Sequence, residues 1–72
     1  MQSNYFSSFL KQLREDRNLK LREVADILRI KLRSYQRYEA GEREPDIDGL
    51  IALADFFNVS LDTLVGRTFP KD

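Results

Sequence analysis

The chain has 72 residues, of which 42% are hydrophobic and 33% charged, and its twelve basic and twelve acidic residues give a formal net charge of zero. This length allows one domain with one small core, and the composition is that of a folded protein rather than a disordered tail. Cysteine and histidine are both absent, which excludes disulfides and thiolate metal sites. With no apolar run near the roughly 20 residues that span a bilayer and no signal-peptide pattern in its polar start, the protein is expected to be soluble and cytoplasmic, with no membrane partner.

The neutral total hides two halves of opposite charge. Residues 17–37 carry seven basic and two acidic side chains, a net charge of +5, whereas residues 38–66 carry one basic and seven acidic ones, a net charge of −6. A phosphate backbone responds to the local field rather than to the total charge. The basic half is therefore the candidate surface for nucleic acid.

The first predicted helix begins near Ser3 or Asn4, either of which can act as an N-cap. It carries one apolar stripe at the spacing i, i+3, i+4, i+7, which is typical of a helix packed on a core: Phe6, Phe9, Leu10 and Leu13. It ends near Asn18, a residue type that tolerates the left-handed conformation found at helix ends.

Two short helices follow. The second begins at about Leu21 and is expected to turn Val24, Ala25 and Leu28 inward, and the third covers Lys31 to Ala40. Only about three residues, 29–31, are left for the turn between them. Two short helices joined in this way form a helix-turn-helix arrangement.

The third helix has two distinct faces at 3.6 residues per turn. Tyr35 and Tyr38 share one face and are assigned to the core, with their hydroxyls expected to reach the surface. The opposite face carries Leu32, Arg33, Gln36, Arg37 and Ala40. Gly41 is placed to end the helix in the left-handed conformation, and Pro45 prevents an immediate restart.

The fourth predicted helix is capped by Asp46 and ends at Asn58. We expect it to bury Ile47, Leu50, Ile51, Ala54 and Phe57. A fifth helix, from Leu61 to Val65, is capped by Ser60 and stopped by Gly66. The pattern predicts an all-α fold, with one five-helix domain over residues 1–66 and a flexible C-terminal tail over residues 67–72.

Four stretches match a known family pattern in the same register. They are Val24 and Ala25 in the second helix, the exit of the third helix at Tyr38, Glu39, Ala40 and Gly41, the later Pro45, and the closing segment DGLIALADFFNVSLDTLVG. From Phe6 to Gly66 the chain resembles the lambda-repressor-like (Cro/Xre) DNA-binding domains. The resemblance implies a compact helix-turn-helix domain that regulates transcription by binding double-stranded DNA, without a cofactor or a small-molecule substrate.

The chain departs from the family pattern at the start of the second helix and in the turn. Leu21 stands where the family commonly has glutamine, and Arg29 and Lys31 replace the usual glycine and the serine or threonine cap. A left-handed conformation at Arg29 would cost roughly 1 kcal/mol relative to glycine.

The resemblance also suggests which residues contact DNA. Arg33 and Arg37 occupy positions that often contact bases, and each can donate two hydrogen bonds to guanine. Leu32 could meet a thymine methyl group, and Gln36 could pair with adenine. The full predicted set is Leu21, Arg22, Arg29, Lys31, Leu32, Arg33, Ser34, Gln36, Arg37 and Arg43, of which Arg29, Lys31 and Arg43 suit phosphates.

A homodimer on a palindromic operator is the expected assembly, because two half-sites strengthen a weak single contact. Phe56, Leu61 and Val65 are the predicted interface. The alternative for these three residues is that they complete the core.

Two functions from different classes fit the sequence. The first is a sequence-specific transcriptional regulator, acting as a repressor. The second is a protein-interaction module of the antitoxin or anti-repressor type, which is motivated by Leu21, Arg29, Leu32 and the acidic half. An enzyme is not expected, because no nucleophile with a nearby base and no glycine-rich phosphate loop can be found.

The acidic residues have structural explanations. Glu39 is expected to pair with an arginine or a backbone amide rather than to act as a base. Asp46 and Asp48 suit the cap and first turn of the fourth helix. No metal site is therefore expected.

Overall fold

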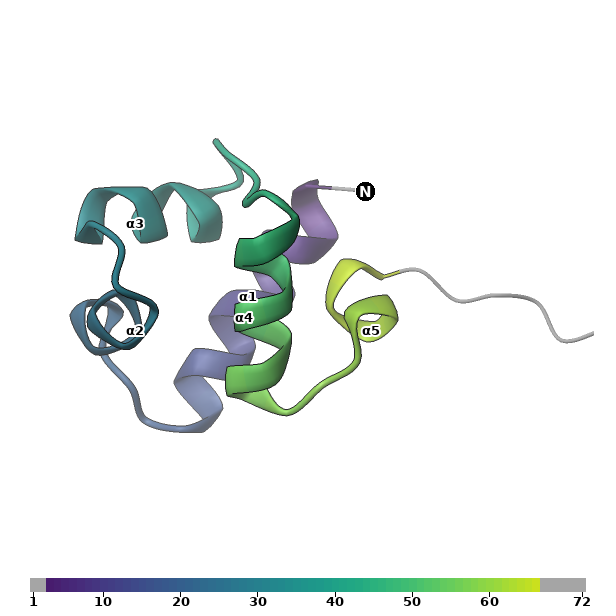
Figure 1. The fold of residues 1–72 in the computed structure, drawn as a ribbon, viewed down its shortest axis with the longest axis horizontal. Helices are drawn as coiled ribbons and strands as arrows, with labels where there is room; N and C mark the ends of the chain where they lie inside the picture. The colour runs from purple at the N-terminus through teal and green to yellow at the C-terminus, as the bar shows by residue number, and fades with distance from the viewer. Residues whose placement is uncertain (1–2, 67–72) are drawn as a thin grey trace, which may run out of the picture.

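The computed structural model describes residues 3–66, and this part of the chain is all-helical, as predicted. Its elements are α1 (Ser3–Asp16), α2 (Leu21–Leu28), α3 (Leu32–Ala40), α4 (Ile47–Phe57) and α5 (Leu61–Val65). The predicted tail, residues 67–72, lies outside the described residues. In Figure 1, α2 and α3 form one side of the molecule, α1 passes behind α4 in the middle, and α5 lies on the other side.

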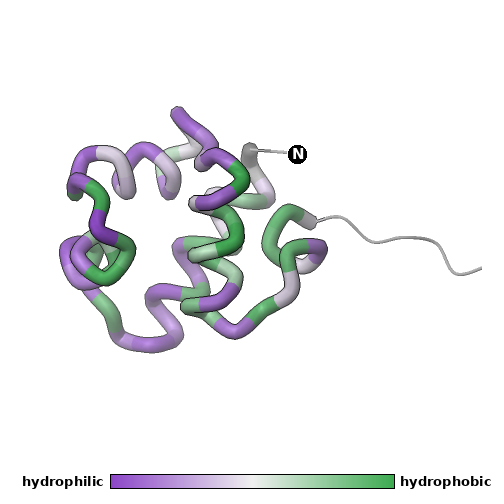
Figure 2. Tube along the Cα trace, in the orientation of Figure 1, coloured by the Kyte–Doolittle hydropathy of each residue, from purple (hydrophilic) through white to green (hydrophobic). Residues whose placement is uncertain are grey.

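The core is assembled from one apolar stripe of each helix. Phe6, Leu10 and Leu13 of α1 are buried as predicted, and Phe9 packs against them from the edge. The other buried apolar residues in the described part are Val24, Ala25, Tyr35, Leu50, Leu53, Ala54, Phe57 and Leu64. Figure 2 shows the result along the chain, with long apolar stretches in α4 and a mostly polar α3. Only one face of α3 therefore packs against the core, and the rest of the helix is mostly polar.

The prediction for α4 was wrong at two positions. Ile47 and Ile51 are 66% and 42% exposed, whereas Leu53 is fully buried. The buried set 50, 53, 54 and 57 follows the i, i+3, i+4, i+7 rule, and Ile47 and Ile51 lie at its edge. Because nearly every position of α4 is apolar, the pattern alone does not identify the buried stripe.

The prediction for the Tyr35 hydroxyl was also wrong. Tyr35 is 0% exposed, and its hydroxyl is buried without a hydrogen-bond partner in residues 3–66. Tyr38 is half-buried and meets the Tyr35 ring edge-on, with 6.3 Å between centroids. Tyr35 is the inward anchor of α3, and the whole side chain, including its oxygen, is in the core.

The predicted caps of the last two helices are confirmed. The Asp46 carboxylate accepts a hydrogen bond from the Gly49 amide (2.8 Å), and the Ser60 hydroxyl accepts one from the Thr63 amide (3.0 Å). Asn58 and Gly66 end α4 and α5 in the left-handed conformation. These local signals fix where each helix begins and ends.

Two arginines, one in α1 and one directly after it, connect α1 to other helices. Arg17 donates to the carbonyl oxygen of Phe57 (2.8 Å) and lies over the Phe57 ring, so it secures the end of α4. Arg14 binds Glu39 near the end of α3. None of the helices in residues 3–66 is long and apolar enough to cross a bilayer.

Candidate nucleic-acid interface

The turn between α2 and α3 has helix-turn-helix geometry. Arg29 ends α2 in the left-handed conformation, with φ 59° and ψ 42°. The next amide, of Ile30, donates to the Ala25 carbonyl (3.0 Å), and Lys31 is extended before α3 begins. The tight turn over residues 29–31 is confirmed, and so is the left-handed requirement at Arg29.

The start of α2 keeps part of a capping arrangement. The Glu23 carboxylate accepts a hydrogen bond from the Lys20 amide at 2.7 Å. Leu21 is half-buried and packs against the core rather than pointing fully outward, while Arg22 is exposed. Arg22 is therefore accessible to a partner, whereas Leu21 contributes mainly packing.

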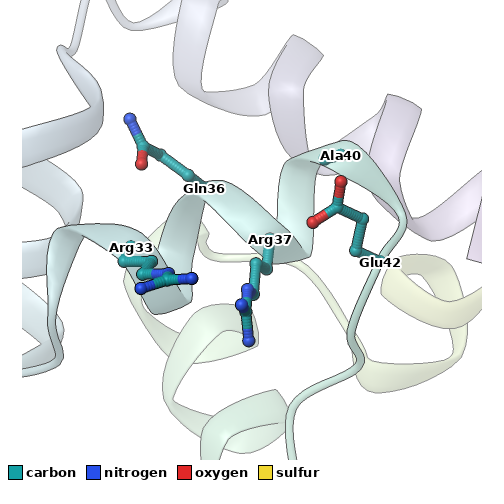
Figure 3. A pocket seen from close by; sticks show the side chains of 5 residues that line it. All are labelled: Arg33, Gln36, Arg37, Ala40 and Glu42. Carbon is teal, nitrogen blue, oxygen red and sulfur yellow. The ribbon is translucent and has the colours of Figure 1, made fainter.

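The outer face of α3 lines an open hollow of about 310 Å³. Its lining residues are Arg33, Gln36, Arg37, Ala40 and Glu42 (Figure 3). The first four share one face, as the 3.6-residue period predicted. Arg33 and Gln36 are exposed and Arg37 is half-buried. Two guanidinium groups and one amide thus line a surface that a partner can reach.

Glu42 is the one member of this hollow that the sequence analysis missed. Gly41 adopts φ 75°, and the Glu42 amide donates to the Arg37 carbonyl at 3.0 Å, which turns the chain back toward the helix end. Helical periodicity stops at Ala40, so it does not place a residue beyond a left-handed cap. The one sequence signal for this change of chain direction was Gly41, because glycine commonly ends a helix in the left-handed conformation.

Other predicted contact residues surround the hollow without lining it. Arg29, Lys31 and Arg43 are exposed, as phosphate contacts require, and Ser34 is half-buried. Leu32 is half-buried and packs against the core, so only part of its side chain is accessible. The structure therefore groups Arg33, Gln36 and Arg37 together, and it leaves Leu21 and Leu32 largely in packing roles.

The inward face of α3 is fixed by an ion pair. Arg14 of α1 binds Glu39 through two hydrogen bonds, Nε to Oε2 at 2.7 Å and Nη2 to Oε1 at 3.0 Å. The pair is nearly buried, and the hydrogen bond that Arg14 donates to Glu39 raises the pKa of Arg14. The predicted structural role of Glu39 is confirmed, and its effect is to hold α3 against α1.

The residues predicted to form a dimer interface lie on α4 and α5. Phe56 is half-buried and packs edge-on against Phe57, with 4.8 Å between centroids. Leu61 is 38% exposed, and Val65 is half-buried against the core. Both predicted roles, interface and core, are compatible with these positions.

No group of three or more acidic side chains in residues 3–66 comes together in a way that could hold a metal ion. Asp46 is engaged as the cap of α4. Arginine guanidinium groups donate hydrogen bonds and cannot be deprotonated in proteins, so the two arginines of the hollow suit hydrogen-bond acceptors.

The two segments of opposite charge occupy mostly different elements. The basic segment 17–37 forms α2 and most of α3, whereas the acidic segment 38–66 runs from the end of α3 through α4 in the middle of the molecule to α5 on the other side (Figure 1). The hollow combines three side chains of the basic segment with Glu42 of the acidic segment.

This fold and this turn define a helix-turn-helix domain. The sequence model of the helix-turn-helix family matches residues 10–64, and the chain belongs to this family, as a domain of the Cro/Xre type.

Individual relatives agree with this assignment. The chain is 41% identical over 62 residues to the HTH-type transcriptional regulator AnsR of Bacillus subtilis (strain 168), which covers 86% of this chain and 53% of that protein. It is 42% identical over 45 residues to the cryptic phage CTXphi transcriptional repressor RstR of Vibrio cholerae serotype O1, covering 62% of this chain and 40% of that protein. The chain spans about half the length of the curated relatives it matches.

A solved structure has the same fold. The crystal structure of a transcriptional regulator from Listeria innocua superposes with a TM-score of 0.85 at 36% sequence identity, covering 93% of this chain and 63% of that chain.

Proposed function

We propose that this chain binds double-stranded DNA in a sequence-specific manner and regulates transcription, as a repressor that occupies a palindromic operator as a homodimer. The observation that carries the proposal is the two-faced α3, whose Tyr35 is fully buried while Arg33, Gln36 and Arg37 line an open hollow. Support also comes from relatives that are named transcriptional regulator and repressor.

The proposed base contacts follow from the chemistry of these side chains. The major groove accepts an α-helix, and there guanine presents two acceptors, O6 and N7, to which one arginine can donate two hydrogen bonds. Arg33 and Arg37 lie one helical turn apart on the same face. Gln36, which lies between them in the sequence, offers the donor and acceptor pair that matches adenine. Three neighbouring side chains could therefore specify several bases of one half-site.

The proposed phosphate contacts lie around that face. The basic residues Arg22, Arg29, Lys31 and Arg43 are exposed. Phosphate contacts orient the protein and make binding depend on salt, with a slope of about −0.9 per contact in log K against log salt concentration.

The proposed dimer rests on apolar surface beside α5. Leu61 is 38% exposed, and Ile51, on the helix that contacts α5, is 42% exposed. A second copy that covers these side chains would remove them from water. The proposed dimer requires its two copies of α3 to lie about 34 Å apart, so that they meet successive turns of the duplex.

The decisive experiment is selection from a randomised pool of double-stranded DNA at moderate salt. The wild type is expected to enrich a palindrome. Arg33→Ala and Arg37→Ala should each lose the base preference at specific positions and weaken binding by about tenfold or more. Lys11→Ala, which removes an exposed charge from α1, is the matched control and should enrich the wild-type sequence.

The same experiment separates the proposed function from a protein-interaction module. A wild type that enriches no sequence, and whose affinity for DNA does not change with salt, would contradict the proposal. The outer face of α3 would then be the place to look for a protein partner.

A further inference from the structure

The hollow on α3 contains a carboxylate among its positive side chains. Glu42 lines it together with Arg33, Gln36 and Arg37. In the view of Figure 3, the guanidinium groups of both arginines lie toward one edge of α3, the Gln36 amide lies toward the opposite edge, and the Glu42 carboxylate lies at the end of the helix near Ala40. The surface therefore has donors along α3 and an ionised acceptor at its end.

Glu42 is held in place by the backbone rather than by its side chain. Its amide donates to the Arg37 carbonyl at 3.0 Å, immediately after the left-handed Gly41, so its Cα has a fixed position relative to α3. In the part of the chain that the structure describes, its carboxylate forms no ion pair, and the side chain is exposed. The backbone therefore fixes where the side chain starts, and the exposed carboxylate is free to meet a ligand.

An ionised carboxylate accepts hydrogen bonds and cannot donate them. In the major groove it would be repelled by guanine O6 and N7 and by thymine O4, all of which are acceptors. Cytosine presents the N4 amino group, a donor, and in a G·C pair this donor lies beside the guanine acceptors. Adenine also presents a donor, N6, but the N7 acceptor of the same base lies beside it and would repel the carboxylate. The arginines of the hollow therefore suit guanine, and Glu42 suits cytosine.

We propose that Glu42 is a specificity-determining residue that selects a cytosine in each half-site by accepting a hydrogen bond from its N4 amino group. This inference rests on the proposed function, because it requires α3 to enter the major groove. It adds a base preference that neither arginine supplies.

The test compares the wild type with two variants, Glu42→Ala and Glu42→Gln, by selection from the same DNA pool. Exactly one position of each half-site is expected to lose its cytosine preference in Glu42→Ala. In Glu42→Gln that position should shift toward adenine, because the amide can donate to N7 and accept from N6. The positions assigned to Arg33 and Arg37 should not change in either variant.

Direct affinities supply the second measurement. Replacing the selected cytosine should weaken DNA binding by the wild type by about tenfold. The same base replacement should weaken binding by the Glu42→Ala variant by less than about twofold. Asp55→Ala removes an exposed acidic group from α4 and changes the net charge by the same amount. This control should bind all duplexes slightly more tightly but retain the cytosine preference.

Two results would overturn the inference, and they are distinguishable. If the wild type selects a palindrome and Glu42→Ala selects the same bases with tighter binding to every duplex, Glu42 only repels phosphates, and the proposed function stands. If the wild type selects no sequence, the proposed function fails and the inference fails with it.

Discussion

Glu39 belongs to the helix that we propose to enter the groove, yet its carboxylate is bound by Arg14 of α1. The side chains of this pair are only 7% and 12% exposed, respectively. Arg14 also donates to the Leu19 carbonyl at 2.9 Å, so one guanidinium joins α1, α3 and the segment before α2. Removing one member of a buried ion pair leaves the other charge without compensation.

Glu39→Gln is therefore expected to lower the free energy of unfolding by about 3 kcal/mol. The double variant Arg14→Met, Glu39→Gln should lose less than the sum of the two single variants, with a coupling of at least about 1 kcal/mol. Urea unfolding of the wild type and the three variants gives all four values. Additive losses would show that the two side chains do not stabilise the fold as a pair.

The buried Tyr35 hydroxyl makes the stability of the fold depend on pH. Burial raises the pKa of the Tyr35 hydroxyl well above its ordinary value, and the negative charge of Glu39 raises it further. In the unfolded chain the hydroxyl ionises near pH 10. Above that pH the unfolded state loses a proton that the folded state keeps, so stability falls as pH rises, by up to about 1.4 kcal/mol per pH unit.

Tyr35→Phe should remove this loss. At pH 7 the variant is expected to match the wild type within about 1 kcal/mol, because the hydroxyl has no hydrogen-bond partner in the described residues. Between pH 7 and pH 11 its stability relative to the wild type should increase. Tyr38→Phe, on the same helix, corrects for the general effect of removing a tyrosine hydroxyl. An equal difference at both pH values would contradict the assignment.

At the scale of the elements, the α2–α3 turn shows how a family geometry persists with unusual residues. Arg29 takes the left-handed conformation that glycine adopts without steric cost, and Lys31 occupies the cap position of α3 without a side-chain hydrogen bond. The turn is held instead by the Ile30 amide and by half-buried Ile30 and Leu28 against the core. Packing thus compensates for unfavourable local residue choices.

Arg29→Gly is expected to raise the free energy of unfolding by up to about 1 kcal/mol, because it relieves the left-handed strain. Lys31→Gly is the control, since Lys31 is extended and gains nothing from glycine. Thermal unfolding of both variants tests this expectation. A loss of stability in Arg29→Gly would show that the arginine side chain contributes packing that exceeds the strain.

At the scale of the whole molecule, the number, order and ends of the helices followed from the sequence because they depend on local signals. Caps such as Asp46 and Ser60 and left-handed ends such as Gly41 and Asn58 act within a few residues. The residues on the outer face of α3 could be predicted for the same reason, because helical periodicity is also a local signal.

Features set by tertiary packing did not follow. Ile51 and Leu53 are both apolar residues of α4, and only the positions of the neighbouring helices decide which one is buried. Glu42 lines the hollow because the chain changes direction after α3, and Arg14 pairs with Glu39, which is 25 residues away in the sequence. No periodic pattern in one segment contains that information.

The assembly also belongs to this scale. Leu61→Lys places a charge on the predicted dimer surface and should shift the protein toward the monomer and weaken operator binding by about tenfold or more. Ile27→Lys changes an exposed apolar residue of α2, which is 51% exposed, and serves as the control. Sedimentation equilibrium measures the mass of each. A wild type that stays monomeric with and without operator DNA would refute the dimer.

The uneven distribution of charge over the molecule also affects how copies of the chain behave toward one another. A formal net charge of zero gives no overall repulsion between copies at neutral pH, and the opposed halves make each copy an electric dipole. Dipoles of this kind attract head to tail at low ionic strength, and added salt screens the attraction. The protein should therefore dissolve more readily as salt is raised from low concentration, over the same range in which its proposed hold on phosphates weakens.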